Sequence, residues 1–149
     1  MEVYWQDLHH SELSTAQLYQ LLALRNTVFV VEQHCPYQDI DGADLRGDNR
    51  HLLAIFDNQL LAYARILAPE SAEKPVKIGR VIVASEARGL SLGNRLMEQA
   101  IASCEHYWPQ HKIFLSAQAH LQAFYGRFGF HAVSDTYLED DIPHIDMEN

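Results

Sequence analysis

One segment of the sequence has the residue types and spacing to bind an anion, and it reads Arg88-Gly89-Leu90-Ser91-Leu92-Gly93-Asn94. A β-branched run, 80–84, precedes it and helix-forming residues follow over 94–102, which predicts a strand, a turn and a helix. The first amides of a helix lack internal partners and carry partial positive charge, so a phosphate can dock there. Gly89 permits a left-handed turn, Gly93 permits close approach of a ligand, and Arg88 adds a cation. A helix cap with a packing glycine is the simpler explanation of the glycines alone.

Two familiar phosphate motifs do not fit this segment. A P-loop requires lysine and then serine or threonine after its second glycine, whereas Asn94 and Arg95 follow Gly93. A dinucleotide fingerprint requires three glycines early in a βαβ unit, and neither condition is met.

The composition favours a single domain with an acidic surface. A chain of 149 residues with 48% hydrophobic residues can bury a core of its own. Twenty acidic residues against eleven basic residues give a net charge of −9. We therefore expect no general affinity for nucleic acid, because such binding depends on lysine and arginine neutralising phosphates. The acidic surface suits a small cationic substrate.

The cysteines and histidines have no spacing typical of a disulfide framework or a metal site. Cys35 and Cys104 are the only cysteines, and residues 1–6 do not resemble a signal sequence, so we expect reduced thiols in a cytoplasmic protein. No apolar run approaches the ~20 residues of a membrane span. None of the nine histidines falls in a His-Glu-x-x-His motif, so we expect no metal.

Hydrophobic periodicity and turn residues predict an alternation of strands and helices. Ser14 and Gln17 form a capping-box pattern that starts a helix over 15–33, although the β-branched run 28–31 leaves its end open. Gly79 indicates a bulge or a close backbone approach within its strand. The expected strands are 3–8, 50–56, 60–67, 77–84, 112–117 and 142–147, and two further helices are expected over 92–102 and 121–129.

Three segments together resemble the GCN5-related N-acetyltransferase (GNAT) superfamily. The Arg-Gly-x-x-x-Gly segment after a Val-Ile-Val strand is similar to the superfamily's coenzyme A pyrophosphate loop, Gln/Arg-x-x-Gly-x-Gly/Ala, with Ser91 where glycine is usual. The block 123–130 resembles its Phe-Tyr-x-x-x-Gly-Phe motif. The run 25–33, followed by Cys35-Pro36-Tyr37 and Asp41, is similar to the ElaA-type branch.

This resemblance implies an α/β (α+β) fold of the GNAT acyl-CoA N-acyltransferase type, formed by a single domain over residues 1–149. Its mixed, mostly antiparallel sheet would have helices on both faces, and acetyl-coenzyme A would enter a cleft opened by the strand at Val81. The implied cofactor-binding residues are Val81, Ile82, Val83, Arg88, Gly89, Leu90, Ser91, Leu92, Gly93, Asn94 and Gln118.

The implied reaction moves an acetyl group to an amine and needs both a proton donor and a base. An amine with a pKa of about 10.4 is protonated at pH 7 and must lose a proton to attack a thioester. The resemblance implies that Tyr125 protonates the departing thiolate. Glu32 is the leading candidate base, because partial burial would raise its pKa. His51 and His120 are alternatives, and an ion pair of Glu32 with a strand arginine is at least as plausible.

Arg65 and Arg80 lie in otherwise apolar strands, where a buried cation needs a partner. They can receive a carboxylate of an acidic acceptor, but pairing with Glu32 or Asp41 is the preferred interpretation. An acetylated Cys35 is disfavoured, because only His34 lies nearby in sequence as a base.

The resulting hypothesis is direct transfer from acetyl-coenzyme A to a small-molecule or peptide amine in a ternary complex. The protein would use no metal, no nucleic acid and no membrane, and a homodimer is possible. The alternatives are a non-catalytic coenzyme A sensor or partner-binding module on the same fold, and an α/β protein that binds another phosphate ligand. The acceptor itself cannot be read from the sequence.

Overall fold

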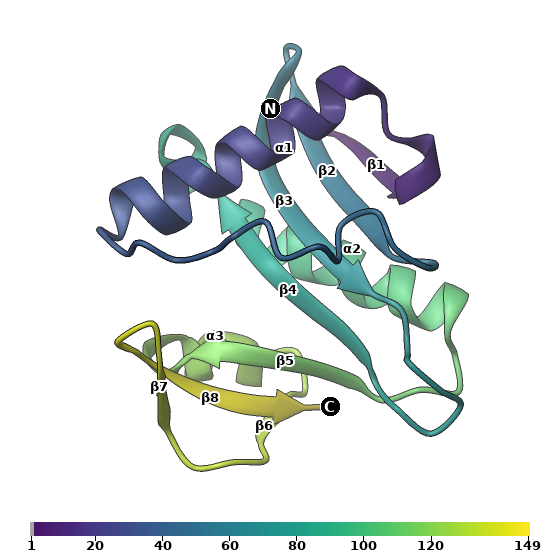
Figure 1. Ribbon diagram of the computed structural model, residues 1–149, viewed down its shortest axis with the longest axis vertical. Coiled ribbons are helices and arrows are strands. Elements are labelled where there is room, and N and C mark those ends of the chain that lie inside the picture. The colour runs from purple at the N-terminus through teal and green to yellow at the C-terminus, as the bar shows by residue number, and fades with distance from the viewer. Residues whose placement is uncertain (1) are drawn as a thin grey trace.

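The computed structural model describes residues 2–149, and these form one sheet of eight strands (Figure 1). The strand order is β1-β2-β3-β4-β5-β8-β6, with β7 paired to β8. Every neighbouring pair is antiparallel except β4 and β5. The strands are β1 (Tyr4–His9), β2 (Arg50–Phe56), β3 (Gln59–Leu67), β4 (Val76–Val83), β5 (Ile113–Gln118), β6 (His131–Ala132), β7 (Tyr137–Glu139) and β8 (Ile142–Glu148).

Helices cover both faces of the sheet, as the sequence predicts. α1 (Thr15–Arg25) crosses the front of β2, β3 and β4 in Figure 1, and α2 (Leu92–Tyr107) lies behind them. α3 (Gln122–Gly126) packs beside β5. Short 3-10 turns span His10–Glu12, Ser85–Ala87 and Ala119–Leu121. None of the helices within residues 2–149 is long and apolar enough to cross a bilayer.

The first helix starts at the predicted capping box and continues as a π-helix. Ser14 Oγ accepts from the Gln17 amide at 3.1 Å, and the Gln17 side chain accepts from the Ser14 amide at 2.9 Å. The chain then forms a π-helical segment, η2 (Asn26–Glu32), over the β-branched residues. The predicted helix is therefore confirmed in extent, with a wider winding in its last part. Such windings concentrate at functional sites.

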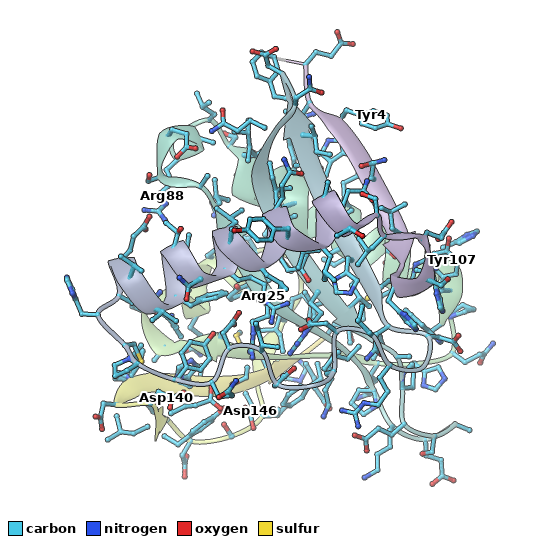
Figure 2. The ribbon with its side chains drawn as sticks, turned by 45° about the horizontal axis from the view of Figure 1, so that its top comes forward. Tyr4, Arg25, Arg88, Tyr107, Asp140 and Asp146 are labelled. Atoms are coloured by element: carbon cyan, nitrogen blue, oxygen red, sulfur yellow. The ribbon has the colours of Figure 1, made fainter. Side chains whose placement is uncertain are left out.

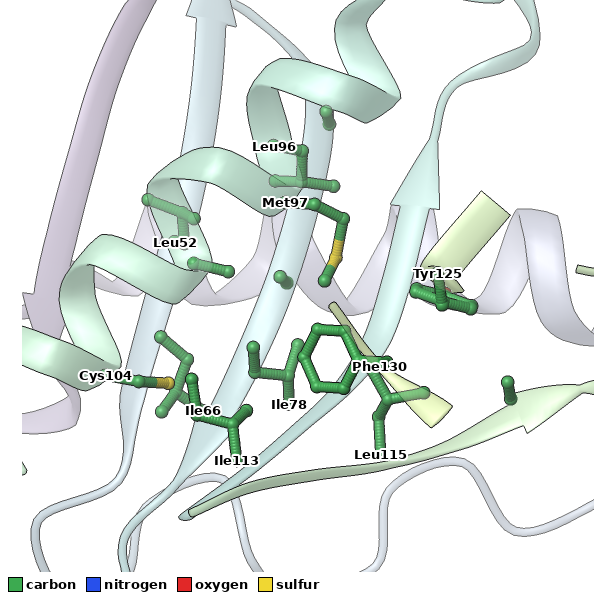
Figure 3. Packing of buried hydrophobic residues seen from close by; sticks show 14 of the residues in the cluster. Leu52, Ile66, Ile78, Leu96, Met97, Cys104, Ile113, Leu115, Tyr125 and Phe130 are labelled. Atoms are coloured by element: carbon green, nitrogen blue, oxygen red, sulfur yellow. The ribbon is translucent and has the colours of Figure 1, made fainter. Parts of the chain in front are cut away.

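Two hydrophobic clusters join these layers. The larger cluster lies between the sheet and α2, where Leu96, Met97 and Cys104 pack against strand residues such as Ile66 and Ile78 (Figure 3). The smaller one lies between the other face and α1 and includes Leu21, Tyr63 and Ile82. Residues of the β3–β4 region therefore face alternate clusters, as expected for a sheet that is covered on both sides.

β4 contains a bulge that separates it from its neighbours. Tyr63 of β3 pairs with Ile82 and Arg65 pairs with Gly79, so one residue of β3 faces two of β4. The left-handed residue is Arg80, with φ +51°, and not Gly79, which corrects the predicted position by one residue. On its other side β4 pairs with β5 only at Val76 and Lys77. The two strands then diverge (Figure 1).

The hairpin and the C-terminal strand follow the turn chemistry of the sequence. Asp57 and Asn58 both have positive φ, at +51° and +61°, which is the geometry of a tight hairpin turn. The last strand, β8, forms where alternation predicts it. The sequence did not predict β6 and β7, which contain only two and three residues.

Candidate functional site

A cavity of about 310 Å³ lies at the start of α2. Ser91 occupies the N-cap position with φ +57°, and its side chain makes no hydrogen bond to the first turn. The first amides of α2 therefore have no side-chain cap and are available to an anion. The lining residues are Val83, Ala87, Arg88, Gly89, Ser91, Leu92, Gly93, Asn94 and Phe124. Leu90, the remaining member of the predicted loop, is 52% exposed and does not line the cavity.

The two glycines of this loop have different roles. Gly89 has φ +87°, a conformation that side chains rarely adopt. At Gly93, a Cβ atom would lie 3.7 Å from the Phe124 ring and 3.9 Å from Val83 Cγ2, which are ordinary contact distances. Protein packing alone therefore does not require glycine at position 93, and the explanation of Gly93 as a packing glycine loses its support.

Arg88 connects this cavity to the end of η2. Its Nε donates to the Val83 carbonyl at 3.1 Å, and its Nη2 lies 2.8 Å from Glu32 Oε1. Both side chains remain accessible, at 49% for Arg88 and 31% for Glu32. Figure 2 shows Arg88 beside the far end of the first helix. The predicted base thus sits in an ion pair with the cation of the loop, and not with Arg65 or Arg80.

The edge of β4 beside this cavity has no strand partner within residues 2–149. Val81 and Val83 pack against the α2 cluster and Ile82 lies in the α1 cluster, so their side chains are part of the core. Because β5 leaves β4 after Lys77, the main chain of residues 81–83 presents an open edge on that side. An extended ligand can add to such an edge as a further strand does.

Tyr125 lies on α3, on the α2 side of the sheet, in the same hydrophobic cluster as Leu115 and Phe130 (Figure 3). It is 7% exposed, and no hydrogen bond from another described side chain shifts the pKa of its hydroxyl. Burial raises the pKa of Tyr125 to about 12. The hydroxyl therefore keeps its proton at neutral pH.

The other predicted polar residues occupy different surroundings. Gln118, at the end of β5, donates to Gln33 Oε1 at 3.4 Å, next to Glu32. His120 is exposed. His51 is fully buried, with Nε2 2.8 Å from the Asp44 carbonyl, and burial lowers its pKa. Since a carbonyl only accepts, Nε2 carries the proton of a neutral ring. His51 is therefore a structural residue and not the base.

A buried ion cluster holds the loop that follows η2. Arg25 is completely buried beneath α1 (Figure 2) and contacts Asp39 Oδ2 at 2.9 Å and Asp44 Oδ1 at 2.6 Å. Burial raises the pKa of Asp44, but the hydrogen bonds and positive charges of Arg25 and Arg65 together outweigh it, so the pKa is lowered overall. Tyr37 adds a hydrogen bond to Asp39 at 2.6 Å.

Arg65 and Arg80 complete this cluster. Arg65 contacts Asp41 at 2.9 Å and Asp44 at 3.1 Å. Arg80 Nε lies 2.8 Å from Asp39 Oδ1, outside hydrogen-bond alignment, and its Nη2 lies 3.4 Å from Asp41 Oδ2. The preferred interpretation is thus confirmed for Asp41 and wrong for Glu32. Three cations face three carboxylates, so no charge remains for an acidic acceptor.

Both cysteines are buried free thiols. Cys35 donates to the Asp140 carbonyl at 3.4 Å, which ties the loop after η2 to the β7–β8 turn. Burial raises the pKa of Cys104 to about 12. Within residues 2–149, no group of three or more potential metal ligands gathers.

A polar chain that we did not single out from the sequence links β5, β7 and β8. Ser116 and Tyr137 hydroxyls lie 2.5 Å apart, and the Tyr137 hydroxyl donates to Asp146 Oδ1 at 2.6 Å. His144 stacks on the Tyr137 ring. A serine inside the apolar run 113–117 was the available signal, but its partners lie 21 and 30 positions away along the chain.

Comparisons with known proteins agree on one family. A family model described as an acetyltransferase (GNAT) domain matches residues 12–149. The ElaA protein of Escherichia coli is 59% identical over 143 residues, covering 96% of this chain and 94% of that protein. The crystal structure of E. coli ElaA has a TM-score of 0.94 at 57% identity, and an acyl-CoA N-acyltransferase from Pseudomonas aeruginosa has a TM-score of 0.94 at 54% identity. Each of these structures covers 99% of both chains.

Proposed function

The chain belongs to the GNAT acetyltransferase family, whose fold transfers acyl groups from coenzyme A, and on this premise we propose that it moves an acetyl group from acetyl-coenzyme A to a primary amine in a ternary complex. The observation that carries the proposal is the uncapped start of α2, which opens into a cavity beside the free edge of β4. Acetyl-coenzyme A supplies the activated acetyl group as a thioester.

The segment 88–94 is proposed to bind the diphosphate. Main-chain amides at the start of α2 offer several donors together with the positive end of the helix dipole. Arg88 is the one charged side chain that lines the described cavity. With Nε on the Val83 carbonyl and Nη2 on Glu32, Arg88 still has donors for a phosphate oxygen. Glu32 thus holds the guanidinium at the mouth of the cavity.

The main chain of Val81, Ile82 and Val83 is proposed to hold the pantetheine amides. The bulge at Arg80 supports this proposal, because it bends β4 away from β5 and leaves this edge unpaired. An amide of the same edge can donate to the thioester oxygen and stabilise the charge that develops there. Gln118 is proposed to contact the same ligand from the end of β5.

Tyr125 is proposed as the proton donor to the departing sulfur. A phenol whose pKa is about 12 is fully protonated at neutral pH, and burial alone, without a hydrogen bond from another described side chain, raises this pKa. Its location on the α2 side of β5 fits a thioester that lies along the open edge of β4.

Glu32 is retained as the proposed base on the strength of its carboxylate and its position. It lies next to the cavity through Arg88 and next to Gln118 through Gln33. Its carboxylate is paired with Arg88 at 2.8 Å, so Arg88 would have to move toward the diphosphate before an amine could take its place.

Calorimetry and thiol release test the proposed function together. Titrating coenzyme A into the protein should give a saturable heat, and 1,5-diaminopentane should accelerate thiol release from acetyl-coenzyme A. No heat would reject the cofactor site. Heat with an amine-independent rate would instead indicate a coenzyme A sensor.

A further inference from the structure

We propose that the acceptor amine docks on the Ser116 hydroxyl, which Tyr137 and Asp146 orient as a hydrogen-bond acceptor, and that the physiological acceptor is a cationic primary amine. This inference rests on the proposed acetyl transfer and adds to it the nitrogen-binding site, the substrate class and a route for the proton.

The direction of the hydrogen bonds in this chain of three side chains is fixed. The Tyr137 hydroxyl has one proton, and it donates this proton to Asp146 Oδ1 at 2.6 Å. Toward Ser116, 2.5 Å away, Tyr137 can therefore only accept, and Ser116 must donate. The remaining lone pairs of Ser116 then point away from the chain. Ser116 is exposed, so these lone pairs are open to an N–H donor, and consecutive hydrogen bonds that end on a carboxylate reinforce one another.

The strand register places Ser116 opposite the bulge. Val76 pairs with Ile113 and Lys77 with Phe114 in the parallel β4–β5 ladder, so continuing this register sets Ser116 level with Gly79. That position is one residue before Arg80, where β4 bends away. Ser116 therefore lies across the diverging strands from the segment proposed to hold the thioester.

Ser116 and Tyr125 lie on opposite faces of β5. Ile113, Leu115 and Ala117 belong to the same cluster as Tyr125 and α2, and side chains alternate along a strand. Ser116 consequently points to the face that carries the loop after η2. Tyr125 would donate its proton to the sulfur on one face of β5, so the opposite face, which carries Ser116, is free for the nitrogen of the acceptor.

The charge around Ser116 favours a cation. Residues 137–149 contain Glu139, Asp140, Asp141, Asp146 and Glu148 and no lysine or arginine. Figure 2 shows Asp140 and Asp146 on this side, below the loop that follows η2. The arginines nearby, Arg65 and Arg80, are already neutralised by aspartates. An ammonium group therefore meets an excess of negative charge here, whereas an acidic acceptor meets repulsion.

Acetyl transfer at this site moves two protons from the nitrogen. The ammonium loses one proton, which passes through Ser116 and Tyr137 to Asp146, in place of Glu32, and then to water. The neutral nitrogen forms the C–N bond, the C–S bond breaks, and the sulfur takes the Tyr125 proton. A second proton, released from nitrogen as the amide forms, returns to Tyr125 through solvent. One proton is thus released for each acetyl group transferred.

Four variants and one control test this site. Ser116→Ala should lower kcat/KM for 1,5-diaminopentane about 10- to 100-fold, the range expected for losing a hydrogen bond to a charged group. The heat of coenzyme A binding and the KM for acetyl-coenzyme A should stay within twofold. Ser116→Thr keeps the hydroxyl and should restore most of the activity. Tyr137→Phe should lower the rate less, and Ser116→Ala/Tyr137→Phe should be no slower than Ser116→Ala alone. Ser71→Ala, in the exposed β3–β4 connection, should change nothing.

Amide NMR provides a readout that does not depend on turnover. Adding 1,5-diaminopentane to the protein saturated with coenzyme A should shift the amides of residues 116 and 146, and Ser116→Ala should abolish the shifts. If coenzyme A binds and the amine accelerates thiol release, yet Ser116→Ala keeps full activity or unchanged shifts, the inference is wrong and the proposed function stands. If Glu32→Gln alone abolishes amine-dependent turnover while Ser116→Ala does not, Glu32 is the base.

Discussion

Replacing Tyr125 by phenylalanine removes the proposed proton donor with the smallest change of shape. The ring packs in the core at 7% exposure, and no hydrogen bond from another described side chain shifts the pKa of the hydroxyl, so we expect the variant to leave no unsatisfied polar group behind. We therefore expect unfolding in urea to change little. The catalytic rate should fall at least about tenfold, which corresponds to ~1.4 kcal/mol in the barrier. The upper end is about 100-fold, since a hydrogen bond to a charged atom contributes about 1.5–3 kcal/mol.

The assay compares kcat for thiol release with the heat of coenzyme A binding. Binding should be unchanged, because the hydroxyl acts only when the sulfur becomes anionic. Tyr107→Phe is the matched control: that residue ends α2, is 43% exposed and keeps its ring for the Arg50 guanidinium that lies above it. The pH profile adds a second criterion. The donor works while protonated and its pKa is about 12, so Tyr125 should cause no loss of rate below roughly pH 11. An unchanged kcat in Tyr125→Phe would remove Tyr125 from this role.

Arg88, Asp44 and the buried Cys104 thiol each have a measurable effect on binding or stability. Arg88→Ala should weaken coenzyme A binding about tenfold at low salt and less at high salt, which calorimetry at two salt concentrations measures. If the variant and the unchanged protein bind coenzyme A with equal affinity, the proposed diphosphate loop is wrong. Asp44→Asn leaves Arg25 without one buried partner and should lower the free energy of unfolding by about 3–5 kcal/mol, measured in urea; a loss below about 1 kcal/mol would show that the cluster relaxes. The raised pKa values of Cys104 and Tyr125 favour the protonated forms in the folded state, so stability is complete below the unfolded pKa values and declines as pH rises from about 9 toward 12. Cys104→Ala should flatten part of this decline, and an identical decline would exclude the thiol.

Local sequence signals predicted those parts of the fold that depend on neighbouring residues. The capping box at Ser14, the turn at Asp57 and the strand before the anion loop all have their causes within a few positions. The bulge shows the limit of such signals. Gly79 was the residue suited to it, yet Arg80 takes the left-handed conformation, and its guanidinium contacts Asp39 and Asp41 about 40 positions away.

The same limit explains what was missed in the site. Arg88 and Glu32 lie 56 positions apart, and no periodicity connects them. The segment 88–94 could be proposed as an anion loop because its own residues carry the signal, whereas the partners of Ser116 come from two later strands. His51 had the right intrinsic pKa for a base, but only the fold reveals that it is sealed against Asp44 and Tyr63.

The ion cluster around Arg25 has a consequence for how this chain can be altered. The loop over 33–49 contains no helix or strand, a type of segment that ordinarily accepts insertions and substitutions freely. Here a single substitution of Asp39, Asp41 or Asp44 leaves an arginine in the interior without one of its carboxylate partners. Joint replacement of one arginine and one aspartate by apolar residues of similar volume keeps the numbers of positive and negative charges equal. Libraries built from paired exchanges should therefore yield many more folded variants at these positions than libraries that randomise one position at a time.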